Sequence, residues 1–193
     1  MKKTLYFIVL ATLCLFIKVN AQPPNNTLTP LKPGDTIPET VWQLSQQVTN
    51  ETTGKEILKL HNYKGKAIIL DFWATWCSSC INNFSKIDSL GKLFGNDLQF
   101  ILVNCIKGTG DSGTKIKAFF VKYNTGLSSP LSAPSIINDS VLKALFPHSF
   151  IPHYVWIGKD GNVKAITSSE ALTYDNVQKF VNNQDLSLTN KSN

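Results

Sequence analysis

Apolar residues along the chain follow two spacings, one typical of buried strands and one typical of amphipathic helices. Residues 67–74 and 98–106 are short apolar runs rich in β-branched and aromatic side chains, as the central strands of a parallel sheet are. Between them, apolar residues recur at steps of three and four from Ile81 to Phe94, and Gly95 follows. That stripe predicts a helix, so the order strand, helix, strand predicts a right-handed parallel crossover.

Later residues continue this alternation. Apolar positions on one face predict helices over residues 114–123 and 140–146. The Asp-Gly pair at 160–161 separates two alternating runs and predicts an antiparallel hairpin, and Thr173 is placed to cap a last helix. These elements together predict an α/β fold with a central mixed β-sheet flanked by helices.

Two additions to this sheet are expected. Residues 40–48 and 55–60 are separated by a turn-rich stretch, which predicts an N-terminal β-hairpin extension. The remaining length is assigned to a helix-containing insertion. In this insertion, residues 108–115 follow a predicted strand and precede a predicted helix, which is where a phosphate-binding loop would lie. That loop requires Lys directly after its second Gly, whereas the order here is Thr114-Lys115. We therefore expect a flexible connection and no nucleotide.

The N-terminus has the layout of a secretory signal peptide. Lys2 and Lys3 precede the apolar run Leu5–Ile17, in which Thr12 is the only polar residue, and small residues precede a cleavage point after Ala21. As a helix this run would be roughly 20 Å long, which is shorter than the hydrocarbon core of a membrane, about 30 Å thick. Cleavage is therefore favoured over an uncleaved membrane anchor.

Four segments are predicted in all. Residues 1–21 are the signal peptide, 22–31 a flexible linker rich in Pro and Asn, 32–185 one domain, and 186–193 a polar tail. The 193 residues are 42% hydrophobic, which suffices for the core of one domain. The four cysteines are a far smaller fraction of the residues than the ~8–10% that is typical of a disulfide scaffold. The cysteines are therefore free for chemistry.

Charge argues against a polyanion partner. The formal charge of +6 comes from 19 lysines, with no arginine, against 13 acidic residues, and three of those lysines lie in the leader. The remainder therefore carries 16 − 13 = +3. Nucleic-acid binders rely on Arg for bidentate contacts with phosphate and guanine, so we expect no nucleic acid among the partners.

Cys77 and Cys80 form a Cys-x-x-Cys pair where a predicted strand ends and a predicted helix begins. Unpaired N–H groups and a partial positive charge at a helix N-terminus favour a thiolate at the first cysteine. Because Cys80 is one helical turn further on, it lies within disulfide reach. We expect Cys77 to attack a disulfide and Cys80 to resolve the mixed disulfide.

The segment from Asp71 to Cys80, Asp-Phe-Trp-Ala-Thr-Trp-Cys-Ser-Ser-Cys, resembles the active-site segment of thioredoxins. Residues 60–66 resemble the exported TlpA/ResA-like branch of that superfamily. The resemblance implies a thioredoxin fold and a thiol–disulfide oxidoreductase without a cofactor beyond its redox-active disulfide. It also implies a reductase of cysteine-containing exported client proteins in a bacterial periplasm or cell envelope, supplied by a membrane thiol electron donor. We expect a monomer.

The resemblance assigns further site residues. Trp76 flanks the dithiol, and Ile151-Pro152 matches the family's cis-proline, where the backbone of Ile151 would pair with the client. Asp71 matches the buried carboxylate that accepts the proton of the second cysteine. Its usual lysine partner is missing from the next strand, so an unpaired Asp71 is expected to have a raised pKa. The exported branch usually has Glu where Asn83 stands, and the proline that kinks the active-site helix is absent.

Other interpretations stay open from the residues alone. A thiol peroxidase of the related redoxin group would need a lone peroxidatic cysteine preceded by Pro and Thr, which Trp76-Cys77 does not provide. A copper metallochaperone on the same fold would bind metal at the reduced pair, and a zinc site would need two more ligands in suitable spacing. Cys105 lies in an apolar strand and is expected to be an inert core thiol. His153 follows the expected cis-proline and is expected to be packed or solvated, with no part in the reaction.

Overall fold

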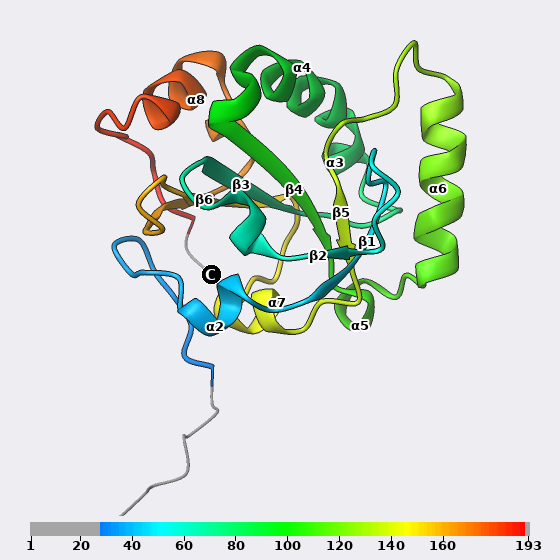
Figure 1. Ribbon diagram of the computed structural model, residues 1–193, viewed down its shortest axis with the longest axis horizontal. Helices are drawn as coiled ribbons and strands as arrows, with labels where there is room; N and C mark the ends of the chain where they lie inside the picture. Colours follow the sequence, from blue (N-terminus) through cyan, green and yellow to red (C-terminus); the bar gives the residue numbers. More distant parts are fainter. Residues whose placement is uncertain (1–27, 192–193) are drawn as a thin grey trace, which may run out of the picture.

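The computed structural model describes residues 28–191. The predicted signal peptide over 1–21 and residues 22–27 of the predicted linker lie outside that range. In the described part, one mixed sheet of seven strands has the order β2-β1-β5-β4-β3-β6-β7, with helices on both faces (Figure 1). Within residues 28–191, no helix combines the length and the apolar character needed to cross a membrane.

The strands confirm the predicted mixed sheet, and β5 is a strand that the sequence analysis did not predict. Strands β3, β4 and β5 run parallel, and β6 pairs antiparallel with both β3 and β7. Every residue of β3 is buried, because layers of helices cover both faces of the sheet. The strands are β1 (Gln46–Thr49), β2 (Ile57–Leu58), β3 (Ala67–Phe72), β4 (Leu98–Asn104), β5 (Ser135–Ile137), β6 (His153–Ile157) and β7 (Val163–Thr167).

Two hydrophobic clusters fill the two sides of the sheet. One lies beneath α3, α4, α6 and α8, and the other beneath α2 and α7, which share the opposite side (Figure 1). The α-helices are α2 (Glu39–Trp42), α3 (Ser78–Asn82), α4 (Phe84–Phe94), α5 (Ile106–Thr109), α6 (Gly113–Thr125), α7 (Val141–Leu145) and α8 (Tyr174–Val181). Short 3-10 helices are η1 (Leu60–Tyr63), η2 (Gly95–Asp97) and η3 (Ser169–Ala171).

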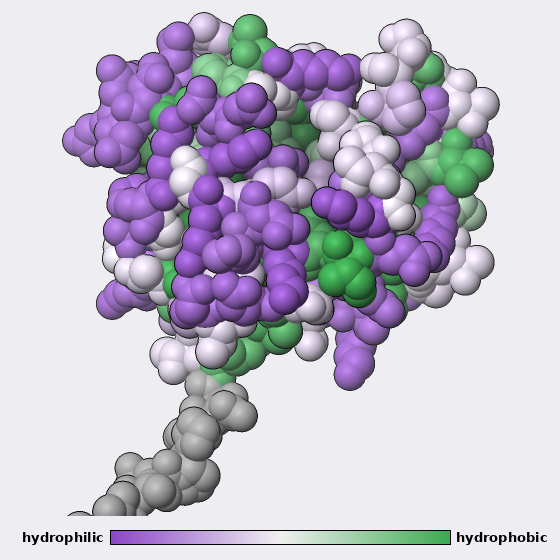
Figure 2. Space-filling model, viewed as in Figure 1, coloured by the Kyte–Doolittle hydropathy of each residue, from purple (hydrophilic) through white to green (hydrophobic). Residues whose placement is uncertain are grey.

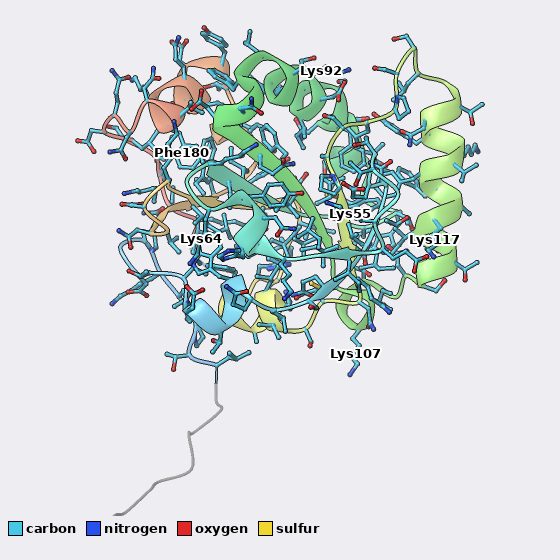
Figure 3. The ribbon with its side chains drawn as sticks, viewed as in Figure 1. Lys55, Lys64, Lys92, Lys107, Lys117 and Phe180 are labelled. Atoms are coloured by element: carbon cyan, nitrogen blue, oxygen red, sulfur yellow. A yellow bond between two sulfur atoms is a disulfide. The ribbon has the colours of Figure 1, made fainter. Side chains whose placement is uncertain are left out.

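Polar residues cover the outside of these layers. The face seen in Figure 2 is mostly hydrophilic. Lys92, Lys107 and Lys117 are exposed and lie at the periphery of the domain (Figure 3). The cap of the last helix is as predicted, since the hydroxyl of Thr173 accepts the backbone N–H of Asn176 at 3.2 Å. The apolar patterns therefore predicted correctly which faces are buried.

The N-terminal hairpin is present but shorter than predicted. β1 pairs antiparallel with β2, as expected for the extension, and also with β5, which joins the hairpin to the main sheet. The first part of the predicted strand over 40–48 is wrong, because residues 39–42 form helix α2. The backbone N–H groups of Val41 and Trp42 both donate to the carbonyl of Pro38, and both side chains are buried. Burial of adjacent residues fits a helical turn better than an alternating strand.

The predicted helix over 81–94 is interrupted after the dithiol. Helix α3 ends at Asn82, α4 begins at Phe84, and Asn83 lies between them. The side-chain amide of Asn83 donates to the carbonyl of Ser79 at 2.9 Å. Such side-chain bonds compete with the helical backbone ladder and interrupt it. The interruption therefore occurs without a proline at this point in the chain.

The C-terminal residues 186–191 lie against the domain, whereas the sequence predicted a polar tail over 186–193. Two leucines of this segment are half-buried against the core cluster beside α8. The backbone N–H of Lys191 donates to the carbonyl of Ile166 at 2.8 Å, and the N–H of Ile166 donates to Asn190 Oδ1 at 3.1 Å. The segment thereby provides hydrogen-bond partners for polar groups of β7, which is an edge strand of the sheet formed by residues 28–191.

Truncation tests this docking. A chain that ends at Asp185 is expected to be about 1–3 kcal/mol less stable than one that ends at Lys191, because it loses partial burial of two leucines and the hydrogen bonds to β7. The free energy of unfolding in urea measures the difference. Equal midpoints for the two chains would show that the segment does not contribute to the fold.

Candidate active site

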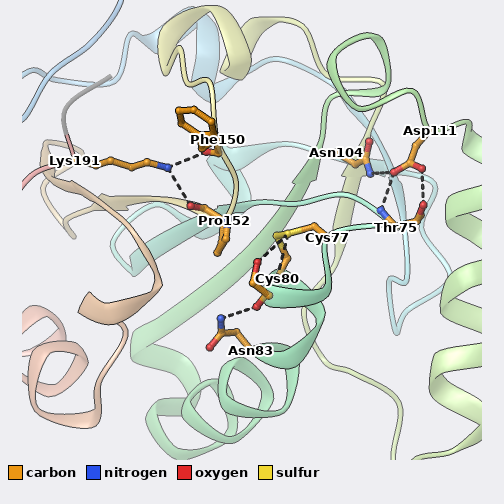
Figure 4. Close-up of a disulfide and its surroundings, with 10 residues drawn as sticks. Thr75, Cys77, Cys80, Asn83, Asn104, Asp111, Phe150, Pro152 and Lys191 are labelled. Carbon is orange, nitrogen blue, oxygen red and sulfur yellow. Dashed lines mark hydrogen bonds between the residues drawn. A yellow bond between two sulfur atoms is a disulfide. The ribbon is translucent and has the colours of Figure 1, made fainter.

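A disulfide joins Cys77 and Cys80 where the loop after β3 enters α3 (Figure 4). Their Cα atoms are 5.3 Å apart, as the three-residue spacing predicted. The two sulfurs are not equivalent, since Cys77 keeps 5% of its surface exposed and Cys80 keeps none. An incoming sulfur therefore reaches Cys77 more easily than Cys80.

The sulfur of Cys77 lies at the start of the helix. It accepts the backbone N–H of Cys80 at 3.2 Å, and the hydroxyl of Ser79 is 3.5 Å away. In the reduced protein, a thiolate in this position would receive a charge-assisted hydrogen bond. The local backbone is therefore arranged to stabilise a negative charge on Cys77.

Asp71 is completely buried on β3, in register with Tyr154 of β6. Neither carboxylate oxygen has a hydrogen-bond partner among the described residues. Burial raises the pKa of Asp71 well above its usual value, and the nearby Tyr154 hydroxyl offsets part of that shift without forming a well-aligned hydrogen bond. The raised pKa expected for an unpaired carboxyl is therefore found.

The loop that contains Pro152 approaches the disulfide from the other side. The peptide bond between Ile151 and Pro152 is cis, as predicted, and Figure 4 shows Pro152 directed toward the dithiol. Behind this loop, the ammonium of Lys191 donates to the carbonyls of Phe150 at 2.8 Å and of Pro152 at 3.2 Å. Sequence reasoning missed Lys191, because nothing in a polar tail indicates that it returns to the site.

Trp76 and Ile151 line a cavity of about 110 Å³, together with Cys105, Lys143 and His148 among others. Trp76 is 58% exposed, so a large aromatic face is open to solvent next to Cys77. Burial, helped by the charge of a neighbouring aspartate, raises the pKa of the Cys105 thiol to about 12. Cys105 is therefore a buried thiol with a raised pKa, as the predicted core thiol would be.

Residues 108–115 are not the flexible connection that we expected. They span the end of α5 and the start of α6, and the side chain of Asp111 between them is fully buried. Its carboxylate accepts the backbone N–H of Thr75 at 2.8 Å and the Thr75 hydroxyl at 2.5 Å. Asn104 Nδ2 donates to it at 2.8 Å, and Lys115 Nζ lies at 2.7 Å. We call these four residues the Asp111 network.

The Asp111 network holds an ionised carboxylate inside the protein. Burial by itself raises the pKa of Asp111, but the hydrogen bonds from Lys115, Thr75 and Asn104 outweigh it, and the net pKa is lowered. Sequence reasoning missed Asp111, because Thr75 and Asp111 are 36 residues apart in the chain. The available signal was an acidic residue flanked by Gly and Ser before a predicted helix, which is common in ordinary loops.

His153 occupies the core at the start of β6. Its ring is fully buried, stacks on His148 with centroids 4.4 Å apart, and meets the edge of Phe72 at 5.5 Å. Neither of its ring nitrogens has a hydrogen-bond partner among the described residues. Burial lowers the pKa of His153 to about 3 and that of His148 to about 4. Both rings are therefore neutral at neutral pH.

This pair predicts acid sensitivity. In the unfolded chain the histidines titrate near ~6.5, so below that pH the unfolded state binds more protons, and stability falls by up to ~1.4 kcal/mol per pH unit per residue. The loss begins below about pH 6.5 and continues toward the folded pKa values of about 3 and about 4. The variant His153→Phe is expected to flatten the decline, measured by urea unfolding between about pH 4 and about pH 7.

The control is His61→Phe, since His61 is exposed. This variant should keep the decline of the parent protein over the same pH range. If the free energy of unfolding fell equally with pH in His153→Phe and in the parent protein, His153 would not be a cause of the acid sensitivity.

The fold and the site together define a class of protein. A mixed sheet with a Cys-x-x-Cys disulfide at a strand-to-helix junction and a cis-proline loop facing it is the arrangement of the thioredoxin superfamily. The model of the Redoxin family matches residues 32–183. The chain therefore belongs to the Redoxin family.

Named relatives agree with this class. The chain is 26% identical over 132 residues to the thiol–disulfide oxidoreductase ResA of Bacillus subtilis, which covers 66% of this chain and 68% of that one. It is 23% identical to ResA of Oceanobacillus iheyensis over 94% of this chain and 86% of that one. Together with its Cys77–Cys80 disulfide, this likeness identifies the chain as a thiol–disulfide oxidoreductase.

Solved structures show the same fold. The thioredoxin domain of a thiol–disulfide oxidoreductase from Bacteroides vulgatus aligns with a TM-score of 0.58 and 19% identity, over 78% of this chain and 99% of that one. The exposed lipoprotein thioredoxin Etrx1 of Streptococcus pneumoniae aligns with a TM-score of 0.55 and 24% identity, over 72% of this chain and 98% of that one. Both confirm the predicted thioredoxin-like fold.

Proposed function

We propose that this protein is a disulfide reductase of exported proteins, with Cys77 as the nucleophile and Cys80 as the resolving cysteine. The observation that supports it most is the difference between the two sulfurs. Cys77 is the more exposed and accepts the N–H at the start of α3, whereas Cys80 is completely buried. A nucleophile needs access and a stabilised thiolate, and a resolving cysteine needs only to reach its neighbour.

The proposed reaction has two exchange steps. The Cys77 thiolate attacks one sulfur of a client disulfide, a mixed disulfide forms, and the other client sulfur leaves as a thiolate that takes up a proton. Cys80 then gives up its proton and attacks the sulfur of Cys77, which releases the second client thiol. Two electrons pass to the client, and the enzyme is left with the Cys77–Cys80 disulfide.

Asp71 is proposed as the proton acceptor for Cys80. A thiol has a pKa near ~8.5 and an ordinary carboxyl near ~3.9, so an ordinary aspartate is too weak a base for efficient transfer. The raised pKa of the buried Asp71 brings it closer to the pKa of a thiol. Its lack of hydrogen-bond partners also leaves both oxygens available for a proton.

The client is proposed to bind across the open side of the dithiol. The exposed ring of Trp76 offers apolar contact area beside Cys77. Ile151 and Pro152 lie on the loop that faces the disulfide, and the backbone of Ile151 would pair with an extended client segment, as an added strand does. Client proteins that carry cysteines in extended segments fit this arrangement.

We further propose that the protein acts outside the cytoplasm as a monomer. Residues 1–21 would be its signal peptide, 22–31 its linker and 32–185 its working domain, in a bacterial periplasm or cell envelope. The layout of the N-terminus and the likeness to a protein named an exposed lipoprotein support the location outside the cytoplasm. A reductase in such a compartment needs a supply of electrons, which a membrane thiol donor would provide.

Cysteine variants test the roles. With dithiothreitol as donor, the protein should reduce insulin, and Cys77→Ser should abolish the activity because no thiolate remains to attack. Cys80→Ser should instead accumulate mixed disulfides with clients, visible as bands that a reductant removes on a gel. Cys105→Ser is the control and should keep full activity, since the Cys105 thiol is buried and has a raised pKa. Insulin reduction by Cys77→Ser would refute the mechanism.

Asp71→Asn tests the proton transfer. The amide cannot take up the proton of Cys80, so the second exchange step should slow by about 10²-fold near neutral pH, as loss of a general base does. Rapid-mixing measurement of mixed-disulfide decay gives this rate. The same substitution at Asp175, which is exposed on α8, serves as the control and should leave the rate unchanged. An equal rate in Asp71→Asn would remove Asp71 from the mechanism.

A further inference from the structure

The Asp111 network joins a buried charge to the loop that carries the dithiol. The carboxylate of Asp111 accepts the backbone N–H and the hydroxyl of Thr75, the amide of Asn104 and the ammonium of Lys115. Figure 4 shows Thr75 and Asn104 converging on it. A carboxylate has about four acceptor sites, so these four donors use all of them. Thr75 precedes Cys77 by two residues, and the main chain just before the nucleophile is thereby tied to a fixed group.

A second set of hydrogen bonds holds Trp76 to the same segment. Its indole N–H donates to the carbonyl of Thr109 at 2.7 Å. The Thr109 hydroxyl donates to Asn104 Oδ1 at 3.0 Å and accepts the backbone N–H of Asp111 at 3.3 Å. The ring of Trp76 is nevertheless 58% exposed. The indole N–H of Trp76 is therefore fixed by a hydrogen bond, while the face of its ring remains exposed to solvent.

We propose that Asp111 is a positioning residue for thiol–disulfide exchange, which sets the place of Cys77 and of the Trp76 ring through its bonds to Thr75. This inference rests on the proposed function. The residue touches no reacting atom, and it acts by fixing the backbone from which the nucleophile extends. Exchange requires the attacking sulfur to line up with the client disulfide, and misplacement by about 1 Å can cost ~10²-fold in rate.

A partial structural match to the Asp111–Thr75 pair lies away from the dithiol, at Asp88, whose side chain is 18% exposed whereas that of Asp111 is fully buried. Asp88 also accepts a backbone N–H and a hydroxyl from one residue, Ser132, at 3.1 Å and 2.9 Å. It also pairs with a lysine four positions later, Lys92, at 2.6 Å, as Asp111 pairs with Lys115 at 2.7 Å. The two aspartates differ in what they hold, because Ser132 lies in the loop before β5 and Thr75 lies in the active-site loop.

This match supplies the control for Asp111→Asn. An asparagine offers two acceptor sites and adds two N–H donors, so at least two of the four donors to Asp111 would lose their partner. We expect Asp111→Asn to lower kcat/KM for insulin reduction about 10- to 100-fold, at a temperature where far-UV circular dichroism shows the full chain folded. Asp88→Asn should stay within about twofold of the parent protein, although it too loses acceptors for a backbone N–H and a hydroxyl. Equal rates for the two variants would overturn the proposal.

Thr75 provides a second test that keeps all charges. Thr75→Val removes the hydroxyl and preserves the shape of the side chain, whereas Thr75→Ser keeps the hydroxyl that donates to Asp111. We expect Thr75→Val to lower kcat/KM at least threefold and Thr75→Ser to restore it to within about twofold of the parent protein. Equal activity of the two variants would overturn the proposal even if Asp111→Asn failed to fold.

Failure of the proposed function is a different result. In that case the parent protein would not reduce insulin, or Cys77→Ser would retain the activity. Failure of the positioning role leaves the parent protein active and dependent on Cys77, while Asp111→Asn and Thr75→Val react as fast as the parent protein.

Discussion

Burial of β3 is the constraint on which the rest of the structure depends. All six of its residues are buried, with β4 parallel on one side and β6 antiparallel on the other. A strand covered in this way can expose chemistry only where it ends, so the loop after Phe72 becomes the place for a reactive group. The dithiol lies there, at the start of α3, and β6 brings Pro152 to the same end of the sheet because Phe72 pairs with His153. The parallel strand β4 ends there too, which brings Asp111 close to Thr75.

Two buried aspartates near this end of the sheet have opposite environments. Among residues 28–191, the Asp71 carboxylate has no hydrogen-bond partner and its pKa is raised, whereas the Asp111 carboxylate has four donors and its pKa is lowered. Burial is common to both, so the difference comes from the hydrogen bonds and the lysine that surround Asp111. A carboxyl that exchanges protons suits the first environment, and a permanent charge that holds a loop suits the second. The same residue type thus has a raised pKa in one buried setting and a lowered pKa in the other.

Local patterns predicted much of this molecule because the forces behind them are local. The apolar periods predicted β3, β4, the stripe of α4 and the hairpin of β6 and β7, and the Cys-x-x-Cys spacing placed the disulfide. Predictions were wrong where a distant or side-chain partner overrides the local preference. Helix α2 replaced part of a predicted strand where Val41 and Trp42 pack together into the core, and Asn83 interrupted a continuous stripe by a bond to Ser79.

By itself the sequence determined the class of fold and the Cys77–Cys80 pair, through side-chain periodicity and through the resemblance of ten adjacent residues to the active-site segment of thioredoxins. Only the tertiary structure decided which polar residues form hydrogen bonds with the loops beside the pair. The bond from Thr75 to Asp111 spans 36 positions, and that from Lys191 to Phe150 spans 41. Hydrogen bonds act over about 3 Å in space, whatever the separation in sequence. Their partners are therefore set by how strands and loops pack, which no local spacing records.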